Sequence, residues 1–133
     1  MQERIKKLVV PLFANHDEMI ISADEAMLNA FRGKAEQTGI PLVVINQLAE
    51  FYKLTNGVPC LDGFDFHRCD DEIVFEWRSN GELWLGQRNM DILRWTNGKF
   101  MLGDASNISY GIDYEFPTLI ELLEAAFADW HCV

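Results

Sequence analysis

The spacing of apolar residues changes twice along this chain, and that change constrains its fold more than any other feature. Over the first 57 residues, apolar side chains recur every three or four positions, as in amphipathic helices. The next stretch is typical of short strands joined by turns, and the last 16 residues, 118–133, return to the helical period. Helices, then strands, then a helix predict a single α+β domain over residues 1–133. A central, mostly antiparallel sheet should be packed by the N-terminal helices and a C-terminal helix.

Two helices are expected before residue 40. Residues 2–10 predict a short helix that ends near Pro11. The segment Ser22–Glu25 has the spacing of a capping box, in which the hydroxyl and the carboxylate satisfy backbone N–H groups at a helix start. Gly39 is the expected end of that helix. Its predicted apolar face consists of Ala23, Ala26, Met27, Ala30 and Phe31.

Residues 42–55 allow two interpretations. The β-branched run from Leu42 to Ile45 suggests a strand, which is the alternative. A helical stripe favours a helix instead, and Asn56-Gly57 supplies a helix stop. We therefore predict a helix with Ile45, Leu48, Ala49 and Tyr52 on its buried face.

The second half predicts an antiparallel meander. Residues 72–77 alternate, with Ile73, Phe75 and Trp77 on one face, and a turn follows at residues 79–81. Further strands are expected at 83–85, at 92–95, at 100–102 and, at an edge, at 108–112, with an Asn97-Gly98 hairpin between the second and third of these.

The final helix has the clearest pattern. Thr118 and Glu121 form a second capping box, just after Pro117. The apolar residues that follow lie on one helical face, which should pack on the sheet. They are Leu119, Leu122, Leu123, Ala126, Phe127 and Trp130.

The chain is strongly acidic, with 11 Lys and Arg against 21 Asp and Glu among 133 residues. Such a charge argues against binding the phosphate backbone of nucleic acid. The acid is concentrated in residues 58–133, which carry 14 acidic and 5 basic residues. This excess is either a solvated surface or a recognition face for a cationic protein.

No targeting or membrane segment is expected. The apolar run from Leu8 to Ala14 is shorter than a signal peptide requires and contains Pro11. No segment approaches the length of a membrane-spanning helix. Three cysteines without a CxxC spacing argue against a disulfide framework, so the expected location is the cytoplasm.

Sequence motifs of catalysis are absent. The chain has no P-loop, no GxSxG elbow and no HExxH. The nearest metal pattern is Cys60, His67 and Cys69; a strand over residues 64–69 would place the last two on one face. The alternative is a pair of buried cysteines with a surface histidine. We predict neither a catalytic set nor a bound metal or cofactor.

Several short motifs together resemble one family. Phe51-Tyr52 followed by Asn56-Gly57 resembles a signature of the SUKH superfamily, which includes the fungal cell-wall-synthesis regulator and the bacterial protein Syd. The later segments that match, in order, are Leu61–Phe66, Trp84-Leu85-Gly86, Leu102-Gly103-Asp104 and Phe116–Leu119. The resemblance spans about residues 38–130. It implies one α+β domain without a conserved catalytic set.

The same resemblance suggests a function. Many bacterial members are thought to be immunity proteins that neutralise a toxin, while others are regulators or interaction modules. We therefore expect a binding module that inhibits a basic toxin domain; a regulator of a host protein, or a metal-binding protein using residues 60–69, are the alternatives. A deep cleft lined with titratable groups would speak against this view. The expected contact residues are Asp62, Asp65, Asp70, Asp71, Glu72, Glu76 and Glu82, with Trp84 as a possible exposed anchor.

Overall fold

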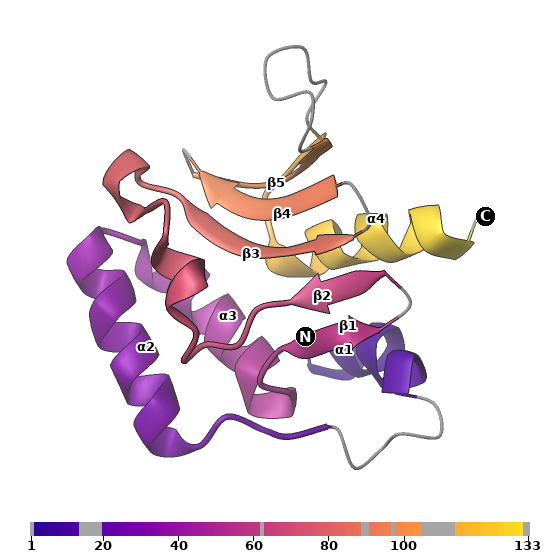
Figure 1. Ribbon diagram of the computed structural model, residues 1–133, viewed down its shortest axis with the longest axis horizontal. Helices are drawn as coiled ribbons and strands as arrows, with labels where there is room; N and C mark the ends of the chain where they lie inside the picture. The colour runs from indigo at the N-terminus through magenta and orange to yellow at the C-terminus, as the bar shows by residue number, and fades with distance from the viewer. Residues whose placement is uncertain are drawn as a thin grey trace.

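The computed structural model describes residues 2–13, 20–61, 63–88, 91–96, 98–104 and 114–131 (Figure 1). It contains four α-helices: α1 (Gln2–Val9), α2 (Glu25–Thr38), α3 (Leu42–Leu54) and α4 (Leu119–His131). Three short 3-10 helices are η1 (Val10–Phe13), η3 (Glu72–Phe75) and η4 (Arg78–Asn80). The strands are β1 (Val58–Leu61), β2 (Phe64–Phe66), β3 (Leu83–Arg88), β4 (Asp91–Thr96), β5 (Lys99–Asp104) and β6 (Tyr114–Phe116).

The six strands form one sheet in their chain order, and every neighbouring pair is antiparallel. The predicted α+β class, with a sheet packed by N-terminal and C-terminal helices, is therefore confirmed. Thr96 pairs with Lys99 across the predicted hairpin, where Gly98 adopts a φ of 84°. Asn97 lies outside the described residues, as does the edge strand expected at 108–112.

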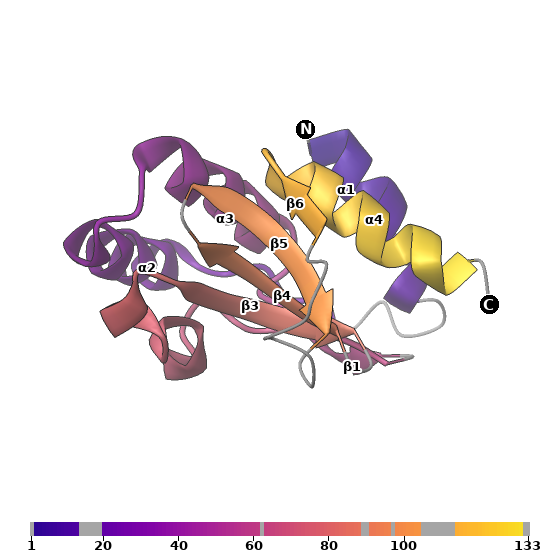
Figure 2. The ribbon, with the colours of Figure 1, turned by 90° about the horizontal axis from the view of Figure 1, so that it is seen from above.

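The helices form a layer on one face of the sheet. Figure 2 shows α1, α3 and α4 on the same side, while α2 packs against α3. The core lies between the layers, and its largest fully buried side chains include Phe13, Phe31, Phe51, Tyr52, Phe64, Phe66 and Phe100. On the opposite face, β3 to β6 present a row of partly or fully exposed side chains: Trp84, Arg94, Met101 and Glu115.

Helix α2 begins at a different cap from the expected one. Asp24, rather than Ser22, accepts a hydrogen bond from the backbone N–H of Met27 at 2.8 Å. The hydroxyl of Ser22 instead donates to the carbonyl of Leu54. The capping-box prediction was wrong because tertiary contacts hold Ser22 outside the helix.

The buried face of α2 also differs from the prediction. Leu28, Phe31 and Ala35 are buried, while Ala26 and Ala30 are exposed. Burying leucine rather than alanine removes more apolar surface from water, which favours this rotation of the helix. The expected helix end is confirmed, since Gly39 has a φ of 89° and its N–H donates to carbonyl oxygens of the last helical turn.

Residues 42–54 are helical, as predicted, and the whole expected face of α3 is buried. Half of the capping box predicted for α4 is confirmed: Thr118 Oγ1 accepts from the N–H of Glu121 at 3.3 Å, while the Glu121 carboxylate accepts from the Thr118 hydroxyl at 3.0 Å. Gln47 on α3 accepts from the N–H of Leu119 at 2.8 Å and so joins the two helices. Leu119, Leu122, Leu123 and Ala126 are buried; the side chains of Phe127 and Trp130 lie outside the described part.

The strand predicted at 72–77 does not form. This segment contains η3 instead, and η4 follows it; the consecutive residues Val74 and Phe75 are both buried, which an alternating strand does not allow. The burial of Val74 and Phe75 in the core favours this shape, and a local bond supports it, because the carboxylate of Asp71 accepts from the N–H of Ile73 at 3.1 Å and caps η3. The acidic residues of this segment therefore lie on a short helical projection beside β3.

Candidate functional site

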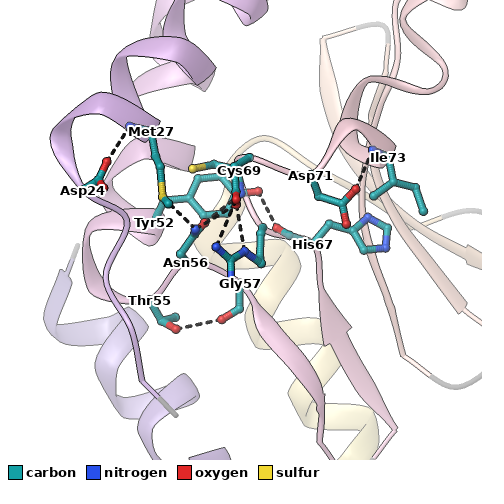
Figure 3. Close-up of polar contacts among 12 residues, drawn as sticks. Asp24, Met27, Tyr52, Thr55, Asn56, Gly57, His67, Cys69, Asp71 and Ile73 are labelled. Atoms are coloured by element: carbon teal, nitrogen blue, oxygen red, sulfur yellow. Dashed lines mark hydrogen bonds and ion pairs between the residues drawn. The ribbon is translucent and has the colours of Figure 1, made fainter. Parts of the chain in front are cut away.

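The motif Phe51–Gly57 organises the segment that follows β2 (Figure 3). The hydroxyl of Tyr52 donates to the backbone carbonyl of His67 at 2.9 Å. Burial raises the pKa of this phenol well above its usual value, and the nearby Cys69 and Asp70 raise it further. Tyr52 therefore remains a hydrogen-bond donor and holds the chain at His67.

Asn56 makes the largest set of bonds in this motif. Its Oδ1 accepts from the N–H of Cys69 at 2.8 Å, and its Nδ2 donates to Asp70 Oδ1 at 3.1 Å. Its own backbone N–H donates to the carbonyl of Ile21 at 2.6 Å. One side chain thus ties the end of α3 to the segment that enters η3.

Two glycines of the matched motifs lie against the backbone of β2. Gly57 has a φ of +86°, and a Cβ atom there would lie 2.6 Å from the carbonyl oxygen of Phe66. At Gly86 a Cβ atom would lie only 2.1 Å from the carbonyl oxygen of Asp65. Four residues of the motifs that resemble the SUKH signature, namely Tyr52, Asn56, Gly57 and Gly86, are thus structural contacts around residues 65–70.

A cavity of about 510 Å³ opens where this segment meets β3. Val58, Phe66 and Ile73 supply apolar walls. The polar lining includes Asp65, His67, Asp71 and Gln87. Residues of β1, β2, β3 and η3 form this site together, and a cavity with such a titratable lining counts against the expectation of a module that acts through its outer surface alone.

His67 presents a hydrogen-bond acceptor at this cavity. Only 6% of its surface is exposed, and its Nδ1 lies 3.1 Å from the carbonyl oxygen of Trp84. Since a carbonyl only accepts, we assign the proton to Nδ1, which leaves a lone pair on Nε2 in the neutral ring. Nε2 lies 4.0 Å from Asp65 Oδ2, beyond hydrogen-bond distance.

Gln87 fixes the carboxylate of Asp65. Its Nε2 donates to Asp65 Oδ2 at 2.7 Å, while its Oε1 is buried and has no hydrogen-bond partner among the described residues. Neither Gln87 nor Ile73 was expected from the sequence to belong to a site. Gln87 lies opposite Asp65 in the register of β2 and β3, two residues after Leu85. This position would have identified Gln87 only if the pairing of the two strands had been known.

The structure groups four of the predicted contact residues. Asp70, Asp71, Glu72 and Glu76 are all exposed, and we call them the acidic ridge. Two shallow depressions border the ridge. Phe31 lines the first, Glu76 lines the second, and Glu72 and Phe75 line both.

The other predicted contact residues lie elsewhere. Asp65 faces the cavity, and Glu82 lies 3.9 Å from Arg94 on the opposite face from the helices. Asp62 lies outside the described residues. The expected site is thus divided between the ridge, the cavity and the sheet face.

The ridge residues differ in how their charge is balanced. Arg68 donates two hydrogen bonds to Asp70, at 2.9 and 3.1 Å, and these lower the pKa of that carboxyl; the bond from Asn56 adds to the effect. Asp71 caps η3. Glu72 and Glu76 form no ion pair within the described part of the chain. Arg78 and Lys34 line the neighbouring depressions without pairing with them.

Trp84 is neither fully exposed nor covered by a helix. Its ring stacks on Trp77 at 4.7 Å with an interplanar angle of 3°, and its Nε1 donates to the carbonyl of Gly86. Trp77, expected to share one face of a strand with Ile73 and Phe75, is only partly buried, and its segment is not a strand. The two rings form a pair at the junction of η3, η4 and β3.

The expectation that His67 and Cys69 share a face was wrong, because β2 ends at Phe66. His67 lines the cavity, whereas Cys69 lines the depression beside Phe31. Within the described ranges, no three His, Cys, Asp or Glu residues are placed to hold a metal ion. The side chain of Cys60 is outside those ranges.

Cys69 is expected to react slowly as a nucleophile. Burial, together with Asp70, raises the pKa of its thiol from 9.0 to about 11, so the thiolate fraction falls about 100-fold at neutral pH. In a Cys60→Ser, Cys132→Ser variant, Ellman's reagent should label Cys69 about 100-fold more slowly in buffer than in guanidinium chloride. Equal rates in the two solvents would contradict this placement of the thiol.

Comparison with known protein families, curated proteins and solved structures finds no match to this chain. The resemblance to the SUKH superfamily therefore stays a prediction. None of the helices in the described residues has the length and apolar character needed to span a bilayer.

Proposed function

We propose that this chain is a non-catalytic protein-binding module that docks a basic partner on its acidic ridge. In line with the SUKH resemblance, we propose further that it is a cytoplasmic immunity protein and that the partner is a toxin domain. Binding would be stoichiometric and would cover the basic surface with which the toxin contacts its own substrate.

The observation that carries this proposal is that Glu72 and Glu76 are exposed and form no ion pair among the described residues. Glu72 lies in η3, and Glu76 lies at its end. Exposed, unpaired carboxylates attract a cationic surface at long range and so raise the rate of association with it. The apolar side chain of Phe75 between them gives the depressions a floor that a partner residue can contact.

The test uses the full chain and two double variants with the same change in net charge. Glu72→Lys with Glu76→Lys reverses the ridge, while Glu3→Lys with Glu36→Lys reverses two exposed residues on α1 and α2. Wild-type chain is used to capture a stoichiometric partner from cells that produce it. We expect the ridge variant to bind that partner at least about tenfold more weakly, and the control to bind within about twofold of wild type.

The salt dependence and the partner's activity give separate readouts. The association rate of the wild-type chain should fall as ionic strength rises, because exposed charges are screened. Unchanged affinity in the ridge variant, or the absence of any stoichiometric partner, would refute docking on the ridge. A partner that kills cells lacking this chain supports immunity, whereas a harmless partner would refute it.

A further inference from the structure

The cavity beside His67 gathers several hydrogen-bond acceptors, although Asp65 already accepts one bond from Gln87 and Asp71 one from the N–H of Ile73. The carboxylates of Asp65 and Asp71 line it, and neither forms an ion pair with Lys or Arg in the part of the chain described. Nε2 of the 6% exposed His67 has its lone pair on the same side as Asp65, and Gln87 Oε1 is a buried acceptor without a partner. The Gln87 oxygen and the His67 nitrogen are costly to bury unless a donor meets them, while the two carboxylates keep free acceptor positions.

The nearest cation does not fill this role. Arg68 lines the cavity, but its guanidinium is bonded to both oxygens of Asp70. The pair is close to neutral, so the carboxylates of Asp65 and Asp71 determine the charge of the cavity. Its complement is a cation with several donors.

The apolar walls decide between the two common cations of proteins. An ammonium group is compact and strongly hydrated, so Val58, Phe66 and Ile73 would oppose its entry. A guanidinium group is planar, weakly hydrated and carries five N–H donors in fixed directions. The volume of about 510 Å³ also lies in the usual range of ligand pockets.

We propose that this cavity binds a guanidinium group, supplied by an arginine side chain of the partner that docks on the acidic ridge. Asp65 and Asp71 would accept from its N–H groups, His67 Nε2 would accept a further bond, and the arginine stem would lie along Val58 and Ile73. Only the origin of the arginine rests on the proposed function.

The direct probe is N-acetyl-arginine amide, titrated into the ¹⁵N-labelled full chain and followed by NMR. We expect saturable shifts of the Gln87 side-chain amide and the His67 ring, with a Kd in the millimolar range typical of a single side chain. The neutral, nearly isosteric citrulline derivative should cause no saturable shift. The lysine derivative should bind at least about fivefold more weakly.

Conservative variants locate the site. Asp65→Asn and Asp71→Asn keep an acceptor for Gln87 Nε2 and for the N–H of Ile73, and each should weaken arginine-amide binding at least about fivefold. Glu36→Gln, on the exposed face of α2, should leave it unchanged. No shift near His67 up to about 50 mM, or equal shifts with the citrulline derivative, would overturn the guanidinium site.

The results also separate this inference from the proposed function. If free L-arginine binds about tenfold more tightly than the amide, the cavity takes the free amino acid, and a partner side chain as the source is excluded. If the ridge variant loses its partner but the wild-type chain does not bind the arginine amide, the guanidinium site is refuted and docking on the ridge is not. If the wild-type chain binds the arginine amide but the ridge variant still binds its partner, docking on the ridge is refuted and the guanidinium site is not.

Discussion

Replacing Gly86 with alanine is expected to destabilise the fold by about 3 kcal/mol or more. The added Cβ would lie 2.1 Å from the carbonyl oxygen of Asp65 and 2.9 Å from the Cα of Phe66. Both atoms belong to the backbone of β2, which pairs with β3 at this point, so no side-chain rotation relieves the clash. The sheet must separate locally, and the contacts of the nearby cavity should be lost with it.

Gly33 offers a matched control for the same substitution. It lies within α2, is exposed, and has open space where a Cβ would be. Gly33→Ala should therefore stabilise the protein by about 0.5–1 kcal/mol, since alanine favours the helix. Urea unfolding of both variants provides the measurement, and a loss of less than about 1 kcal/mol for Gly86→Ala would show that β2 and β3 are not as close as described.

Replacing Asn56 with alanine should be the second most damaging change, at about 3 kcal/mol. The substitution leaves the buried N–H of Cys69 without its acceptor at 2.8 Å and removes the donor to Asp70. An unpaired buried N–H carries the full cost of its desolvation, and a bond to a charged carboxylate is worth more than a neutral one. The segment from His67 to η3 should then lose its attachment to α3.

Asn46→Ala is the matched control, because it removes the same side chain at an exposed site. Asn46 is exposed on α3 and accepts one bond from Arg32 at 2.9 Å, so its loss should change stability by no more than about 0.5 kcal/mol. Hydrogen exchange gives a local readout, because the amide of Cys69 should exchange faster in Asn56→Ala than in wild type. If the two alanine variants were equally stable, Asn56 would not have the structural role described.

The candidate site could be predicted from the sequence only where its residues are contiguous. The carboxylates of residues 70–76 are close in space because they are close in the chain, so a list of acidic residues was sufficient to find the ridge. The cavity joins Asp65 to Gln87, which are adjacent only through the pairing of β2 with β3. The Phe51–Gly57 motif drew attention through its resemblance, but its bonds to residues 67–70 required coordinates.

Local signals in the sequence were enough to predict the α+β class, helix α4 with its cap at Thr118, and the hairpin at Gly98, because hydrophobic period, capping chemistry and turn preference all act over a few neighbouring residues. Contacts between distant segments set which face of α2 is buried and keep residues 72–77 out of the sheet. They also bring Asp65, His67, Asp71 and Gln87 into one cavity. These outcomes depend on packing and hydrogen bonds between segments distant in the chain, which local preferences do not encode.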